Sequence, residues 1–156
     1  MSTALTRETS SRPVRTTALR TAAIGAGGIL LGFAGLQIAL AAGAPLGEHV
    51  WGGTQDRVLP TGMRAVAGAA AIALTAAAAI VVRRAGLFGR PARWLSPATW
   101  AISGYLALNT VGKLASSSGV ERWAFGPATA VAACLTAVVA RRSGGMVGRR
   151  DPSVSA

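Results

Sequence analysis

Long stretches without charge are the feature that most limits what this chain can fold into. Residues 21–43, 65–82 and 123–140 contain no charged side chain, and residues 97–114 contain only Lys113. A helix needs about 20 apolar residues to cross the hydrocarbon core of a bilayer. Only 13% of the 156 residues are charged, whereas soluble domains carry about 25%. The pattern excludes an ordinary soluble enzyme and a disordered chain, and it predicts a multi-pass membrane protein.

The apolar stretches predict an all-α fold, an antiparallel up-down bundle of four transmembrane helices. The expected spans cover 21–43, 64–82, 97–114 and 122–140, and they form one membrane domain over 21–140. Their connectors are short enough to join antiparallel neighbours. Residues 1–20 and 141–156 are polar and basic, and we expect two disordered tails. Pro127 lies inside the last span and predicts a kink or a late helix start, because proline has no amide hydrogen.

Basic residues are distributed unevenly among the connectors. The two tails and the 83–96 connector hold twelve of the 16 basic residues, and the 44–63 and 115–121 connectors with the adjoining helix ends hold the other four. Basic residues that flank short loops stay on the cytoplasmic side. We therefore expect both termini in the cytoplasm and these two connectors outside. A cleaved signal peptide stays open as an alternative for the first span, although its apolar stretch exceeds the usual ~7–15 residues.

Glycines gather on one part of the first span. Gly25, Gly28, Gly32 and Gly35 follow one another at intervals of three or four residues. Small residues at this spacing let helix backbones approach closely in lipid. We expect these four glycines to pack against neighbouring helices of the same bundle. The alternative is a homodimer that forms through the same glycine face.

A few polar side chains lie at membrane depth. Gln37 and Asn109 are expected at similar depth, toward the outer side. Tyr105, Asn109 and Lys113 recur every four residues, so they share one helix face, which should turn toward the bundle because an unpaired amide in hydrocarbon is costly. This face either makes a hydrogen bond between helices or forms the floor of an outward-facing pocket. No acidic residue lies inside a span, which argues against an ion-coupled transporter.

The outer connectors hold most of the candidate binding residues. One hypothesis pairs Glu48 with Arg64 and Glu121 with Lys113 at the rim, and the other is a polar ligand site at the mouth of the bundle. Ser118 and Glu121 also have the spacing of a capping box at a helix start. The candidate ligand-binding residues are Glu48, His49, Trp51, Arg64, Tyr105, Asn109 and Glu121.

Residues suited to catalysis or metal binding are scarce. His49 is the one histidine and Cys134 the one cysteine, so an internal disulfide is impossible and a zinc site lacks ligands. We expect no metal, no cofactor and no catalytic residue. The net charge is +11, and the basic residues lie beside the apolar stretches. Membrane topology accounts for basic residues at these positions, so we expect no nucleic-acid partner.

The outer loop also carries a motif. Residues 43–53 read G-A-P-L-G-E-H-V-W-G-G, and Trp100, Tyr105, Asn109, a serine run and Glu121-Arg122 follow further on. This arrangement resembles small four-span bacterial membrane proteins of the actinobacterial type, which share a G-x-P-x-G-x-x-x-W-G-G segment after the first helix. The resemblance implies a bacterial cytoplasmic membrane and the four-span layout. It implies no chemistry.

Together these observations favour a non-catalytic binding or interaction protein with an outward-facing polar site. Its expected partners are the lipid bilayer and a second copy of the chain or another membrane protein. A small transporter or a membrane-embedded enzyme for a lipophilic substrate is the alternative.

Overall fold

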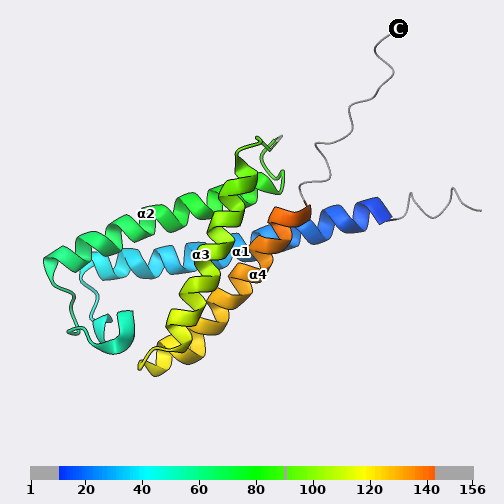
Figure 1. Ribbon diagram of the computed structural model, residues 1–156. Helices are drawn as coiled ribbons and strands as arrows, with labels where there is room; N and C mark the ends of the chain where they lie inside the picture. Colours follow the sequence, from blue (N-terminus) through cyan, green and yellow to red (C-terminus); the bar gives the residue numbers. More distant parts are fainter. Residues whose placement is uncertain (1–10, 90, 143–156) are drawn as a thin grey trace, which may run out of the picture.

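The computed structural model describes residues 11–89 and 91–142, with side chains from residue 16 to residue 141. The regular structure of this part of the chain is helical, which confirms the predicted all-α class (Figure 1). A single π-helical turn precedes the last helix, and the loop after the first helix contains two 3-10 turns, Gly47–His49 and Trp51–Gly53. The helices are α1 (Ser11–Ala42), α2 (Thr61–Arg84), α3 (Leu95–Leu114) and α4 (Gly126–Arg142), and the π turn is Glu121–Phe125.

Three segments of the described chain have the length and composition of membrane spans. They are Thr16–Ala42, Thr61–Arg84 and Glu121–Arg141. The 20-residue helix α3 is not among them, because hydroxyl side chains, Asn109 and Lys113 interrupt its apolar residues. The predicted four helices are therefore confirmed, and three of them are apolar enough to cross a bilayer.

The first helix begins ten residues earlier than predicted. Residues 11–20 are helical, so the prediction of a disordered tail is wrong for this part. The reason is Leu19, which is 4% exposed and continues the buried stripe of Ala22, Ala23 and Ala26 toward the N-terminus. This spacing keeps one face of the helix against its neighbours. Residues 141–142 end helix α4, so the predicted disordered tail is wrong for them as well. Residues 1–10 and 143–156, the rest of the predicted tails, lie outside the described residues.

The four helices form two hairpins. Helix α1 runs beside α2 and also contacts α4, and α3 runs beside α4, whereas α2 and α3 share the fewest contacts among these neighbouring pairs. The hairpins cross near the 85–94 connector and diverge toward the opposite end (Figure 1). We call this opposite end, which holds the 43–60 loop and the 115–120 connector, the loop end. The other end is the termini end.

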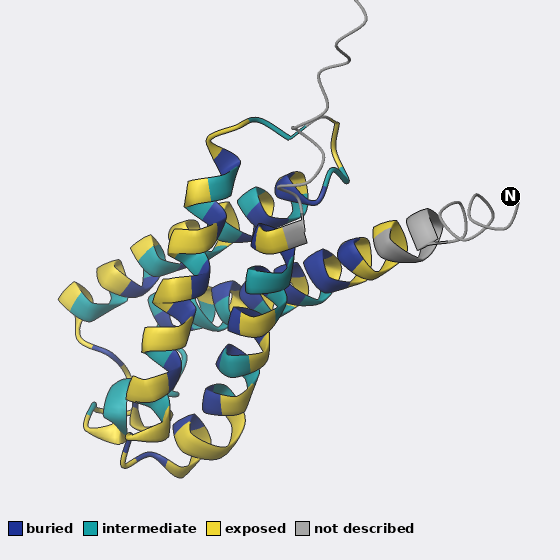
Figure 2. Cartoon of the chain, turned by 45° about the vertical axis from the view of Figure 1, so that its right-hand side comes forward, coloured by how far each residue is buried: buried dark blue, intermediate teal, exposed yellow. Residues whose placement is uncertain are grey.

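Small side chains build the core where the hairpins cross. Ala23 and Ala26 of α1 and Ala132 of α4 are fully buried, together with Leu30 and Val81. Buried positions gather where the helices face one another (Figure 2). Alanine at the contact points brings helix backbones close, and in lipid van der Waals packing of this kind holds helices together.

The glycines of α1 divide into two groups. A Cβ added at Gly25 would lie 3.1 Å from Leu135 of α4, so this glycine packs as predicted. At Gly28, Gly32 and Gly35 an added Cβ would have nothing within 4 Å. The predicted packing within the chain is therefore wrong for these three, because the contact face of α1 passes through Gly27 instead, 3.0 Å from Val82 by the same measure.

A second, smaller core fixes the loop. Val50 and Leu59 are 4% and 2% exposed, and they pack with Leu40 of α1 and Ala67 of α2. An added Cβ at Gly47 would overlap the backbone oxygen of Asp56, so only glycine fits where the two halves of the loop meet. The loop is therefore folded onto the α1–α2 hairpin.

Candidate functional site

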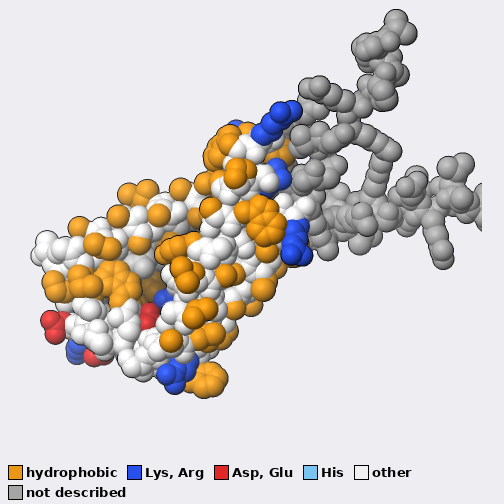
Figure 3. Space-filling view, viewed as in Figure 1, with side chains coloured by type: hydrophobic (Ala, Val, Ile, Leu, Met, Phe, Trp, Pro, Cys, Tyr) orange, Lys and Arg blue, Asp and Glu red, His pale blue; other side chains and the backbone are white. Residues whose placement is uncertain are grey.

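A cavity lies between the two hairpins, in the half of the molecule toward the loop end. Its volume is about 610 Å³, and all four helices, the π turn and the loop contribute to its wall. Most of the wall is apolar, including Leu30, Leu74 and Ile102. The space-filling view shows this hollow between α2 and α3, with apolar side chains around it (Figure 3). Cavities of about 300–1,000 Å³ with apolar walls and a few polar groups are typical ligand sites.

Most polar side chains of the wall lie toward the loop end of their helices, and Tyr105 lies at the middle of α3. Gln37 of α1 and Tyr105, Asn109 and Lys113 of α3 all line the cavity. The prediction that this stripe of α3 turns toward the bundle is confirmed for Asn109 and Lys113, whereas Tyr105 lines the cavity but is 60% exposed. The Asn109 side-chain amide donates to the Tyr105 hydroxyl at 3.3 Å, within α3. This geometry favours the pocket-floor interpretation of Asn109 over a hydrogen bond between helices.

Two phenylalanines that contact each other line the cavity. The rings of Phe33 and Phe125 meet edge to face, with centroids 5.7 Å apart. The Lys113 ammonium lies 5.4 Å from the centroid of the Phe125 ring, on the cavity wall. Sequence reasoning missed both aromatics, because each lies in an apolar span with no motif around it.

The π turn explains how Phe125 reaches this position. Pro127 has no amide hydrogen to continue the helix, and the Gly126 amide donates instead to Glu121 O, five residues back. Gly126 lets the turn pack against α3, since an added Cβ would lie 2.8 Å from Leu114. The predicted late helix start near Pro127 is therefore confirmed, in the form of a π turn. Such turns are frequent at functional sites.

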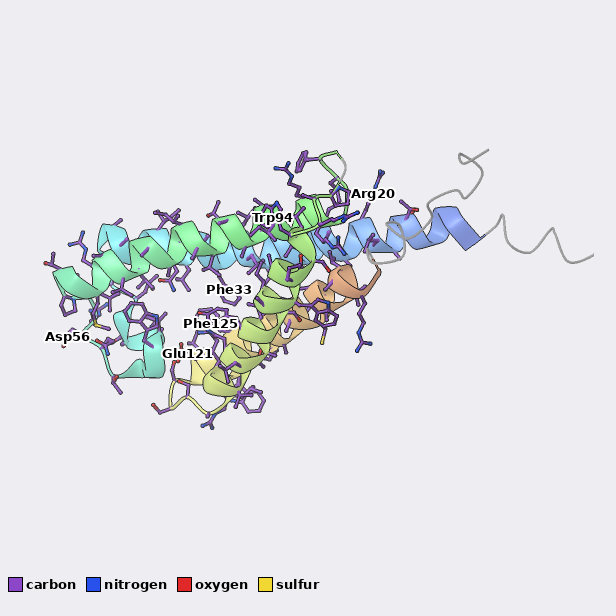
Figure 4. The ribbon with its side chains drawn as sticks, turned by 45° about the horizontal axis from the view of Figure 1, so that its top comes forward. Arg20, Phe33, Asp56, Trp94, Glu121 and Phe125 are labelled. Carbon is purple, nitrogen blue, oxygen red and sulfur yellow. The ribbon has the colours of Figure 1, made fainter. Side chains whose placement is uncertain are left out.

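The carboxylate of Glu121 joins the loop to the α3–α4 hairpin. Its Oε1 accepts from the Lys113 ammonium at 3.0 Å and from the Trp51 amide at 3.0 Å. Its Oε2 accepts from the Ser116 hydroxyl at 2.7 Å and from the Gly52 amide at 2.8 Å. The residue is 3% exposed. We call this arrangement the Glu121 latch, and Figure 4 shows Glu121 close to Phe125 beside the loop.

The backbone of the loop is shaped to receive this carboxylate. Trp51 and Gly52 have positive φ angles, 51° and 86°. Successive amides in such a conformation point into one concave site that binds anions. Positive φ is uncommon for a residue other than glycine, and here it is found at Trp51, whose amide binds the carboxylate.

The serines of the 115–120 connector add further bonds to the loop. The Ser117 hydroxyl donates to Gly52 O at 2.6 Å, and the Ser118 hydroxyl donates to His49 O at 3.3 Å. The Ser118 amide donates to the Ser116 hydroxyl and not to Glu121. The Glu121 amide donates to the Ser118 hydroxyl at 3.5 Å, so the N-cap half of the predicted capping box is confirmed. The reciprocal half is wrong, because the Glu121 side chain is engaged with the loop.

Three predicted site residues lie away from the cavity wall. Glu48 Oε1 lies 3.6 Å from His49 Nε2 and 3.9 Å from Arg57 Nε, on the exposed side of the loop. The Arg64 Nε donates to Ala41 O at 2.9 Å and so caps the C-terminus of α1. The predicted Glu48–Arg64 ion pair is therefore wrong, whereas the predicted Glu121–Lys113 pair is confirmed.

The remaining predicted site residues lie at or beside the cavity. Trp51, Tyr105 and Asn109 line it, and Glu121 lies next to it through its bonds to Trp51 and Lys113. Within the described residues, no three side chains of the metal-ligating types come together.

Comparison with known protein families, with curated proteins and with solved structures finds no match to this chain. The resemblance to small four-span bacterial membrane proteins thus stays a prediction that depends on the loop motif.

Proposed function

We propose that this chain is a four-span membrane protein that binds an amphipathic, lipid-like ligand in the cavity between its hairpins. The observation that carries the proposal is the polarity of that cavity. Its wall is mostly apolar, and Gln37, Asn109 and Lys113 place hydrogen-bonding groups toward its loop end. A molecule with an apolar chain and a small polar head matches both parts.

The proposed topology makes α3 the fourth span. The polar residues that lower its hydropathy, Tyr105, Asn109 and Lys113, line the cavity, and polar groups are tolerated at membrane depth where they face a bundle interior. The distribution of basic residues supports cytoplasmic termini and an outward loop end. The membrane we propose is the bacterial cytoplasmic membrane.

The charges around the cavity favour a head group without net charge. Lys113 is the one basic residue in the wall, and its ammonium is 3.0 Å from the buried Glu121 carboxylate. The pair therefore carries no net charge toward the ligand. An anionic head would meet the Lys113–Glu121 pair and not a free cation, whereas a hydroxyl, ester or amide head can bond to Lys113 and Asn109.

Binding without catalysis is the function that this geometry supports best. Both carboxylate oxygens of Glu121 accept two hydrogen bonds each. The His49 side chain is outside the cavity wall. A structural role for Glu121 follows from its bonds, and no observation favours the alternative of a transporter or an enzyme over a binding protein.

Native mass spectrometry of the protein in lipid nanodiscs tests this proposal. We expect a reproducible lipid-like mass to stay bound, and we expect Ala70→Phe to remove it because Ala70 lines the cavity. Ala69→Phe is the matched control, since Ala69 is its exposed neighbour outside the wall. A bare chain, or a mass that Ala69→Phe and Ala70→Phe reduce equally, would contradict the proposal. Circular dichroism verifies that both variants keep their helices.

A further inference from the structure

The loop end of the cavity is closed. Val50 and Trp51 form part of the cavity wall there, and Val50 is 4% exposed. The Glu121 latch holds the Trp51 and Gly52 amides, and the hydroxyls of the serine connector hold the adjacent carbonyls. A ligand arriving from the water on this side would have to break several charge-assisted and neutral hydrogen bonds at once.

The side between α2 and α3 is open. Val66 of α2 and Tyr105 of α3 line the cavity and are nonetheless 59% and 60% exposed, so they lie at its rim. Ala73 of α2 and Ala101 of α3 have the same two properties. Alanine at these positions leaves the rim wide, and the hollow in Figure 3 lies along this side.

We propose that the ligand enters and leaves sideways, from within the bilayer, through the gap between α2 and α3. This inference depends on the proposed binding function and specifies its substrate class: a lipid that resides in the membrane, and not a solute from the water outside. The gap faces the hydrocarbon region in the proposed topology, because Ala73 lies at the middle of α2 and Tyr105 at the middle of α3, while Val66 lies nearer the loop end. The Glu121 latch keeps the other route shut.

The fluorescence of Trp51 can report both routes, because this indole lies at the cavity wall. The other three tryptophans, Trp94, Trp100 and Trp123, are 44–79% exposed, so they can be replaced by phenylalanine to leave Trp51 alone. The protein is reconstituted in phosphatidylcholine vesicles whose acyl chains carry bromine, and separately in ordinary vesicles with iodide in the water. We expect brominated chains to remove most of the Trp51 emission and iodide to leave it nearly unchanged.

A pair of rim variants separates the cavity from the lipid around the protein. Ala73→Phe narrows the gap and should restore most of the Trp51 emission in brominated vesicles. Ala76→Phe is the matched control, because Ala76 is exposed on the same helix but does not line the cavity, and it should change nothing. If Ala73→Phe does not fold, Ala101→Phe narrows the gap from the opposite helix.

Two outcomes would overturn the lateral route. One is quenching of the Trp51 emission by iodide in the protein that carries no loop substitution. The other is quenching by brominated lipid that neither Ala73→Phe nor Ala101→Phe reduces. In either case the binding function would still be supported if a lipid mass stays bound and Ala70→Phe removes it. The quenching experiment therefore tests the entry route, and the mass spectra test the binding function.

Discussion

The two ends of the molecule differ in the contacts that hold their helices together. At the termini end all four helices meet over alanine and leucine, and Ala23, Ala26 and Ala132 are fully buried. At the loop end the hairpins diverge, and a cavity of about 610 Å³ remains between them. There the hairpins are joined by the Phe33–Phe125 ring contact and by the hydrogen bonds that Glu121 and the serine connector make to the loop. Close packing of small side chains stabilises the first end, and hydrogen bonds to one buried carboxylate contribute much of the contact at the second.

This difference shows where the chain can accommodate a ligand. Helices in lipid gain little from the hydrophobic effect, so close packing and hydrogen bonds have to hold them together. Small side chains supply the packing at the termini end. A latch joins the hairpins at the loop end without filling the space between them, and this combination leaves a cavity in a folded protein.

Removal of the Glu121 charge should have the largest effect, and it should act at the loop end alone. Breaking one partner of a buried ion pair costs about 3–5 kcal/mol, and Glu121→Gln should fall near the lower figure because the amide keeps one acceptor oxygen. We expect amide hydrogen exchange of residues 44–60 to accelerate strongly, while the Ala23–Leu30 segment of α1 exchanges as before. The Trp51 emission in the sole-tryptophan protein should become accessible to iodide.

Glu48→Gln is the control for this variant, since Glu48 lies on the exposed side of the same loop. Exposed pairs contribute about 0–1 kcal/mol, so loop exchange should change little. Equal effects of the two substitutions, or a loss of protection that spreads to α1, would contradict the assignment of Glu121 as the latch.

The same enlargement at the two ends should give opposite results. Ala132→Leu adds volume to a fully buried position, and overpacking costs about 1–3 kcal/mol. Ala73→Leu adds the same volume at the cavity rim, where there is space, and should change the free energy of unfolding by less than about 0.5 kcal/mol. Thermal unfolding in detergent micelles measures both. A larger loss at Ala73 would show that the loop end is as tightly packed as the termini end.

The sequence predicts the termini end better than the loop end. Uncharged stretches locate the helices to within a few residues, except that Leu19 continues the buried stripe of α1 into a segment with a polar composition. The four-residue spacing from Tyr105 to Lys113 is enough to indicate the polar wall of the cavity. The latch is harder to predict, because Glu121 and Trp51 are 70 residues apart and meet only through the fold. A capping-box spacing also describes Glu121, and nothing local decides between the two.

Asn109 should matter for the ligand far more than for stability. Its amide donates only to Tyr105 of the same helix in the described contacts, and polar bonds within membrane bundles average about 0.6 kcal/mol. Asn109→Leu should therefore unfold at nearly the temperature of the parent protein, while the bound lipid mass falls in native mass spectra. The reverse pattern, lost stability with the mass retained, would make Asn109 a structural residue.

The smallest effects on stability are expected at two adjacent glycines of α1, Gly27 and Gly28. Gly27 packs against α2, whereas an added Cβ at Gly28 would have no neighbour in the described part of the chain. Alanine is favoured over glycine in a helix by up to about 1 kcal/mol. At Gly28 an added Cβ meets nothing within 4 Å, so Gly28→Ala should be neutral or slightly stabilising. At Gly27 the Cβ would lie 3.0 Å from Val82, and the contact should cancel the gain. Thermal unfolding compares the two variants.

Gly28→Leu tests the homodimer predicted from the glycine face of α1. If the particle in nanodiscs changes from two chains to one, a second copy of the chain covers this face. If the particle contains a single chain with and without the substitution, the face lies against lipid.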